Sequence, residues 1–212
     1  QAPYKQKSNP FQPMSIFSED EVESIHESSL KVLCDTGIDF QSPRAVEILK
    51  REGAMIDSDG RRVRFDPDFI MEKIATTPSE FTLHGRVKER HVHVGGRSVI
   101  NTMVSSAPNV SDLDRGRIIG NFEDYSNLIK LGESLNTVHA LGGYPVEPCD
   151  IDVQLRHLHA VSAAVRLSTK PLFGYAIGSE RMLDAIEVVR IGRGVDEETL
   201  LKEPSITTVV NA

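Results

Sequence analysis

The chain has 212 residues and a formal net charge of −7, with 39% hydrophobic and 26% charged residues. These fractions are typical of a globular protein, and the acidic balance argues against nucleic acid as the main partner. Because the sequence contains no apolar run near the ~18 residues of a membrane-spanning helix and starts with polar residues, we expect neither a membrane span nor a signal peptide. Two widely separated cysteines, Cys34 and Cys149, favour a reducing cytoplasm.

Residues 1–16 are rich in proline and are predicted to form an extended arm, either loose or wrapped on a partner subunit of a homo-oligomer. A helix should follow, because Ser18 and Glu21 have the spacing of a capping box and Gly37 can end a helix in the left-handed conformation. The residues of its inward-facing stripe are expected to be Val22, Ile25, Ser29, Val32 and Leu33.

Two further helices are predicted where a capping residue precedes proline, at Ser42-Pro43 and at Asp66-Pro67. A short strand over residues 62–65 lies between them. Proline suits the first turn of a helix because the backbone N–H that it lacks would have no acceptor there. These elements and the first helix predict a small α+β cap.

From Phe81 the pattern changes to short runs of alternating apolar and polar residues. Gly95-Gly96 predicts a tight hairpin between the runs on either side of it, since glycine readily takes the positive φ angles that such turns need. We therefore divide the chain after residue 95. Residues 1–95 would form the arm and the cap, and residues 96–212 a second domain.

Strand-like runs recur at a fixed interval in the second half of the chain. Three of them start at Thr137, Pro171 and Ser205, which are 34 residues apart, and one more step back reaches Met103 inside another such run. Segments long enough for a helix separate them. Four strand–helix units in register predict a parallel sheet wound by right-handed crossovers.

Two architectures use such units. A closed barrel of eight units needs ~250 residues, about 31 for each unit, and an open doubly wound sheet is also compatible. No G-x-G-x-x-G follows any of the runs, which argues against a dinucleotide-binding sheet. We predict the N-terminal half of a (β/α)8 TIM-type barrel, that is, its first four units. Because the sequence stops directly after a strand, we expect it to be the front part of a longer protein.

Polar and aromatic residues accompany each of the four predicted strands. In a barrel, ligand-binding groups lie at the carboxyl ends of the strands and in the loops after them. This rule predicts a substrate-binding site made of Ser105, Asn109, Asp112, Tyr144, Tyr175 and Asn211. The alternative is that they are ordinary loop and turn residues.

Asp112 indicates which kind of ligand such a site would hold. A carboxylate at a barrel mouth, beside an aromatic ring such as that of Tyr144 or Tyr175, attracts a cationic amine through Coulomb and cation–π interactions. Asp112 also lies close in sequence to Arg115, so a salt-bridged loop without a binding role remains open. The residues alone identify no catalytic side chain.

His91 and His93 have the spacing of a metal-ligand pair, because alternate residues of a strand face the same side. A metal-dependent hydrolase barrel would place such a pair at the end of its first strand, and this is the alternative function. Here a charged run precedes the pair and Gly95-Gly96 follows it, so we expect a solvated hairpin and no metal. His157 and His159 repeat the spacing on a predicted helix, where residues two apart do not share a face.

Five short segments, spread over nearly the whole chain, form one pattern. They are residues 25–37 (IHESSLKVLCDTG), 52–57 (EGAMID), 62–65 (RVRF) with the helix after it, 81–86 (FTLHGR), and 112–117 (DLDRGR) leading into a helix with Asp124. This pattern resembles the trimethylamine methyltransferase family.

The resemblance implies a fold and an activity. Members of that family are barrels that move a methyl group from a methylated amine, such as trimethylamine or glycine betaine, to the cobalt of a separate corrinoid protein. No cofactor would then bind this chain directly, because the corrinoid (cobalamin) comes with the partner protein. Members that use trimethylamine carry pyrrolysine later in the barrel, at a position expected beyond residue 212. A non-catalytic amine-binding protein of the same fold remains an alternative.

Overall fold

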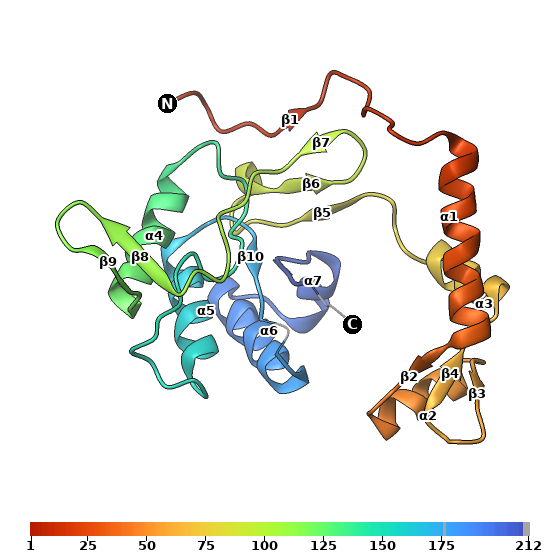
Figure 1. The fold of residues 1–212 in the computed structure, drawn as a ribbon. Coiled ribbons are helices and arrows are strands. Elements are labelled where there is room, and N and C mark those ends of the chain that lie inside the picture. Colours follow the sequence, from red (N-terminus) through yellow and green to blue (C-terminus); the bar gives the residue numbers. More distant parts are fainter. Residues whose placement is uncertain (176, 210–212) are drawn as a thin grey trace. The chain divides into compact units, whose positions relative to one another are not determined.

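The computed structural model describes residues 1–175 and 177–209 (Figure 1). Contacts divide the chain into two units, Phe11–Ser79 and a larger one made of Gln1–Pro10 with Glu80–Ala212. This division differs from the predicted boundary after residue 95, because the arm and the residues just before that boundary form strands that pair within the larger unit. Each helix in the described residues falls short of the length or the apolar character needed to cross a bilayer.

The smaller unit packs helices against a three-stranded antiparallel sheet with the order β2-β4-β3. Its elements in chain order are α1 (Glu19–Lys31), a π-helical turn (Val32–Thr36), β2 (Ile38–Asp39), α2 (Pro43–Arg51), β3 (Met55–Ile56), β4 (Arg62–Arg64) and α3 (Pro67–Ala75). Val63, in the middle strand, is fully buried and packs in one cluster with Val46, Ala54 and Phe65. This unit therefore has a core of its own.

All three helix starts predicted for this unit are confirmed. The Ser18 hydroxyl accepts a hydrogen bond from the N–H of Glu21, and the Glu21 carboxylate accepts one from the N–H of Ser18, which completes the capping box. Ser42 and Asp66 cap the two helices that begin with proline. Each cap provides an acceptor for a backbone N–H that has none within the helix.

The prediction of an inward apolar stripe on α1 is wrong. No residue of α1 is buried, and Val22 and Ile25 are about half exposed. Leu33, in the π-helical turn after α1, does pack against the core of this unit. The other apolar contacts of that core come from α2, α3 and the sheet, so α1 keeps an exposed apolar face.

The larger unit begins with short antiparallel strands. They are β1 (Lys7–Ser8), β5 (Phe81–Leu83), β6 (Val92–Val94), β7 (Ser98–Val99), β8 (Asn109–Asp112) and β9 (Gly116–Ile119). The hairpin predicted at Gly95-Gly96 is wrong, because β6 pairs with β5 and β7 pairs with β1. The arm is thus bound to its own chain through β1. A hairpin of β8 and β9 also occupies part of the region between the first predicted strand and the next helix.

Four extended segments follow one another as neighbours in the larger unit, over residues 101–103, 139–141, 171–174 and 205–207. A parallel bridge joins Thr102 to Ala140, and the N–H of Leu141 donates to the carbonyl of Pro171 at 3.0 Å. β10 (Leu172–Phe173) and β11 (Ile206–Thr207) pair in parallel. The predicted parallel direction is therefore confirmed for the first and last of these pairs. Closure into a barrel stays a prediction.

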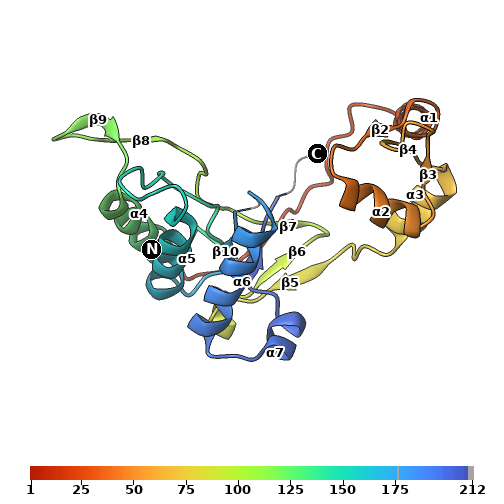
Figure 2. The ribbon, with the colours of Figure 1, turned by 90° about the horizontal axis from the view of Figure 1, so that it is seen from below.

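Helices pack against these segments. They are α4 (Phe122–Ser134), α5 (Arg156–Leu167), α6 (Ser179–Arg193) and α7 (Glu197–Lys202). α5 lies between α4 and α6, as Figures 1 and 2 show from two directions. Ile129, Val161 and Val189, one from each of the first three helices, are buried in one apolar cluster with Leu141 and Leu172 of the segments. This core fixes the ends of the segments, where the predicted site lies.

Candidate functional site

The carboxyl ends of the extended segments are tied together by hydrogen bonds to backbone carbonyl groups. The N–H of Ser106, after the first segment, donates to the carbonyl of Tyr144, after the second, at 2.8 Å. The Thr208 hydroxyl, after the fourth segment, donates to the carbonyl of Gly174 in the third at 2.9 Å. The predicted site residues on these loops are therefore held on neighbouring pieces of backbone.

Tyr144 and Tyr175 are stacked on one another, and we refer to them as the tyrosine pair. Their ring centroids are 3.7 Å apart and the ring planes differ by 16°. Tyr125 of α4 meets the ring of Tyr144 edge-on at 6.1 Å, shares a hydrogen bond with Tyr175, and donates its hydroxyl proton to the carbonyl of Ala160 at 3.0 Å. The structure thus brings two predicted site residues together and adds a third tyrosine.

All three tyrosines are buried, which keeps their hydroxyl groups neutral. Burial raises the pKa of Tyr144 to about 12 and raises the pKa values of Tyr125 and Tyr175 as well. Arg156 pairs with Glu147 at 2.5 Å, and their opposite charges act on the pKa of Tyr144 in opposite directions. The tyrosine pair is therefore a buried, uncharged aromatic group beside the ion pair of Arg156 and Glu147.

Asp112 belongs to a different group of side chains. Its carboxylate accepts hydrogen bonds from the backbone N–H and the Nε of Arg115, which hold the pKa of Asp112 below its ordinary value. The Arg115 guanidinium also donates to Asp124, a buried residue in the first turn of α4, at 2.6 Å. The salt-bridged loop that the sequence left open is therefore present, and Arg115 already compensates the charge of Asp112.

Of the other predicted residues, the structure describes Ser105 and Asn109. The Ser105 hydroxyl lies 3.3 Å from that of Ser106. A Cβ atom added to Gly143 would lie only 2.5 Å from the Ser105 hydroxyl, so the loops after the first and second segments meet closely at this point. Ser106 has a φ of 65°, the one positive value for a non-glycine residue in the described part of the chain. Asn109 is the first residue of β8 and is partly buried. Asn211 lies outside the described residues.

Tyr125 and Asp124 contact predicted site residues or their partners, although their own sequence context does not single them out. A positional signal existed, because α4 follows the first segment and its first turn must therefore lie near the carboxyl ends of the segments. No local pattern indicates which distant residues these two side chains would contact. Tyr125 bonds to a carbonyl 35 positions away in the chain.

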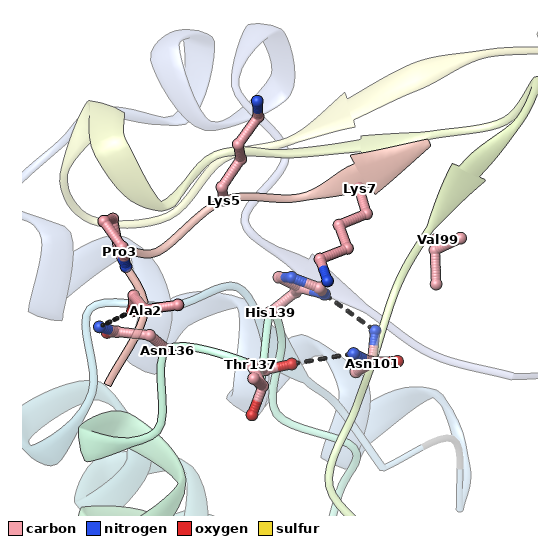
Figure 3. A pocket seen from close by; sticks show the side chains of 9 residues that line it. All are labelled: Ala2, Pro3, Lys5, Lys7, Val99, Asn101, Asn136, Thr137 and His139. Carbon is pink, nitrogen blue, oxygen red and sulfur yellow. Dashed lines mark hydrogen bonds between the residues drawn. The ribbon is translucent and has the colours of Figure 1, made fainter. Parts of the chain in front are cut away.

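A separate cavity of about 330 Å³ lies at the opposite ends of the segments, beneath the arm (Figure 3). Its nine lining residues, none of them acidic, are Ala2, Pro3, Lys5, Lys7, Val99, Asn101, Asn136, Thr137 and His139. His139 is buried, and its Nδ1 accepts the backbone N–H of Asn101 at 2.9 Å. This cavity is separate from the predicted substrate site, since Thr137 and Val99 precede the segments that Tyr144 and Ser105 follow.

The two histidines with metal-ligand spacing have different neighbours. His93 on β6 pairs with Glu80 at 3.0 Å, whereas the ring of His91 packs against that of His84 with centroids 4.6 Å apart. Within the described residues, no group of three or more His, Cys, Asp or Glu side chains could hold a metal ion. His91 and His93 thus contact different side chains.

The chain is similar to several proteins that are named as methyltransferases of methylated amines. Glycine betaine methyltransferase of Desulfitobacterium hafniense (strain Y51) is 33% identical over 198 residues, which cover 93% of this chain and 41% of that protein. Trimethylamine methyltransferase MttB from another strain of that species is 26% identical over 89% of this chain and 38% of its own length. Proline betaine:corrinoid methyltransferase of Eubacterium limosum is 26% identical over 75% of this chain and 33% of its own length.

The chain thus spans about two fifths, or less, of the curated relatives that it matches. The family model described as trimethylamine methyltransferase (MTTB) matches residues 1–212. Both the match over the whole chain and the identity to the first of these relatives agree with the residue pattern found in the sequence. The chain belongs to the trimethylamine methyltransferase family.

Proposed function

We propose that the protein to which this chain belongs transfers a methyl group from a methylated amine to the cobalt of a corrinoid protein. The observation that carries this proposal is the family match over residues 1–212. The names of the relatives support it, because they include glycine betaine and trimethylamine methyltransferases and a proline betaine:corrinoid methyltransferase. A quaternary amine of the betaine type is the favoured substrate, since the relative with 33% identity over 93% of this chain carries that name.

The proposed fold is a (β/α)8 barrel of which residues 96–212 supply the first four units. The parallel pairs Thr102–Ala140 and β10–β11 support it, as do the intervening helices α4, α5 and α6. In such a barrel the tyrosine pair and the β8–β9 hairpin would lie at the carboxyl ends of the strands, which is where barrel enzymes have their active sites. An experimental structure of the full-length protein with the segments in an open sheet would contradict this fold.

The proposed substrate site has the tyrosine pair as its aromatic wall. Neutral aromatic rings attract an ammonium group without a full charge of their own, and burial of the pair keeps water away from the amine. The remaining proposed contributors are Ser105, Asn109, Asp112 and Asn211. The reduced cobalt of the partner acts as the methyl acceptor, so the task of these residues is to bind the amine, orient it and exclude water.

The test uses the full-length protein with a panel of methylated amines that includes trimethylamine, glycine betaine and proline betaine. Reduced cobalamin, free or bound to the cognate corrinoid protein, serves as acceptor, and formation of methylcobalamin is followed by its absorption spectrum. We expect methyl transfer from at least one quaternary amine. Amine binding without transfer to either acceptor would instead favour a non-catalytic amine-binding protein.

A further inference from the structure

The β8–β9 hairpin carries exposed apolar side chains on a projecting element. It extends away from the rest of the larger unit beside α4 in both views (Figures 1 and 2). Leu113 at its tip is 104% exposed and Ile119 at its end is 69% exposed. Single exposed apolar residues are common on protein surfaces. The exposure of these two is therefore evidence of a binding role only in combination with the rigidity of the hairpin and its position.

The hairpin is held in one conformation by a set of mutually supporting contacts. Asp112 accepts the backbone N–H groups of Asp114 and Arg115 within the turn, and Gly116 supplies the positive φ of 65° that closes it. The Arg115 side chain then bridges Asp112 to the buried carboxylate of Asp124. A surface loop ordered in advance loses less conformational entropy when it binds a partner.

The base of the hairpin is joined to the proposed substrate site. The carbonyl of Ala107 accepts the N–H of Glu147, and the N–H of Ser106 donates to the carbonyl of Tyr144, both at 2.8 Å. The hairpin therefore rises from the same backbone that positions one ring of the tyrosine pair. A protein that brings a methyl acceptor up to this end must come close to the hairpin.

We propose that the β8–β9 hairpin is a docking element for the methyl-accepting corrinoid protein, with Leu113 and Ile119 as its apolar contacts. This inference rests on the function proposed above. The two acidic and two basic side chains of residues 112–117 balance in charge, so a polar partner surface gains little from them. The partner would therefore present an apolar depression, and the association would depend only weakly on salt.

The experiment measures binding and transfer separately on the full-length protein. The dissociation constant for the cognate corrinoid protein, loaded with cobalamin, is determined by titration calorimetry, and methyl transfer to free reduced cobalamin is measured in parallel. We expect Leu113→Asp to weaken binding about 10-fold or more. Transfer to the free cofactor should not change, because the Leu113 side chain is fully exposed at the tip of the hairpin and is not one of the residues proposed for the substrate site.

A matched control is Leu201→Asp, which introduces the same charge at a leucine of α7 that is 77% exposed. This variant should bind the corrinoid protein like the wild type.

Equal dissociation constants for Leu113→Asp and the wild type would overturn the docking proposal, and so would a wild-type protein that does not bind the corrinoid protein. A change of oligomeric state in Leu113→Asp alone, seen by analytical ultracentrifugation, would also overturn it, because the hairpin would then belong to a subunit interface. Failure of wild-type transfer to free cobalamin bears on the proposed function instead.

Discussion

Tyr175 offers a direct test of the aromatic wall. A desolvated cation–π contact contributes about 2 kcal/mol, so loss of the ring in Tyr175→Leu should raise the KM for the amine at least about 10-fold. Tyr175→Phe keeps the ring that stacks on Tyr144 and loses the hydroxyl group that bonds to Tyr125. It should keep a KM near that of the wild type in the methylcobalamin assay.

Both variants at Tyr175 remove contacts from a buried cluster, so their thermal unfolding must be measured beside the kinetics. A KM for Tyr175→Leu equal to that of Tyr175→Phe, in proteins that remain folded, would exclude the ring of Tyr175 from the amine site. The ring of Tyr144 would then have to be tested by the same pair of substitutions.

His139 should make attachment of the arm depend on pH. Its Nδ1 accepts a backbone N–H from Asn101, which can only donate, so the ring must be neutral with its proton on Nε2. Two residues of the arm contact the His139 ring: the Tyr4 ring lies nearly perpendicular to it, with centroids 5.7 Å apart, and the backbone of Lys5 forms a hydrogen bond with it. Burial lowers the pKa of His139 below its ordinary value of 6.5, and the positive charge of Lys170 acts in the same direction.

Because the pKa of His139 is lowered in the folded state, the stability that it contributes is complete above pH 6.5 and is lost as the pH falls through the lowered value. Hydrogen exchange of residues 1–10, corrected for intrinsic rates, should therefore accelerate as the pH falls below 6.5. His139→Asn, which does not titrate in this range, should abolish the change. Persistence of the same pH dependence in His139→Asn would assign it to another group.

At the scale of single elements, the β8–β9 hairpin depends on a residue outside it. Asp124→Asn removes the carboxylate that Arg115 reaches across from the hairpin. Arg115 is about half exposed, so we expect a loss of only about 1–3 kcal/mol in the free energy of unfolding. Urea unfolding of the full-length protein measures this loss.

Faster hydrogen exchange over residues 109–119 in Asp124→Asn would show that the hairpin itself has loosened. Glu123→Gln is the matched control, because Glu123 is an exposed neighbour in the same helical turn. If the two variants had equal stability and equal exchange, the ion pair would not hold the hairpin.

Local patterns predicted helix starts better than they predicted strand partners. Ser18, Ser42 and Asp66 all cap helices in the structure, as predicted, because a cap depends on residues only two or three positions apart. The pairing of β6 depends on which other strands of the chain can reach it. In the structure β6 pairs with β5, and β7 pairs with β1. Gly95-Gly96 therefore marks a turn correctly but names the wrong pair of strands.

At the scale of the whole molecule, the chain has two separate buried cores. Val63 belongs to the cluster of the smaller unit and Ile129 to that of the larger one, and both side chains are fully buried. Ile129→Ala should cost roughly 2–5 kcal/mol of local stability. It should accelerate hydrogen exchange in residues 80–175 and 177–209 of the larger unit and leave residues 11–79 unchanged.

Val63→Ala should produce the opposite pattern, with faster exchange confined to residues 11–79, because it removes buried methyl groups from the other cluster. Hydrogen exchange with mass spectrometry on the full-length protein distinguishes the two cases. Faster hydrogen exchange throughout the chain in both variants would mean that the two units unfold together.

The sequence by itself determined the helix caps of the smaller unit, the parallel direction of the first and last pairs of segments, and the family, because these follow from short patterns and from one repeated spacing. Only the tertiary structure decided that Tyr125 joins Tyr144 and Tyr175, that Arg115 holds Asp124, and that the arm pairs with β7. Most of these contacts join residues tens of positions apart in the chain. They form where folded surfaces meet, and which surfaces meet depends on the packing of the whole unit.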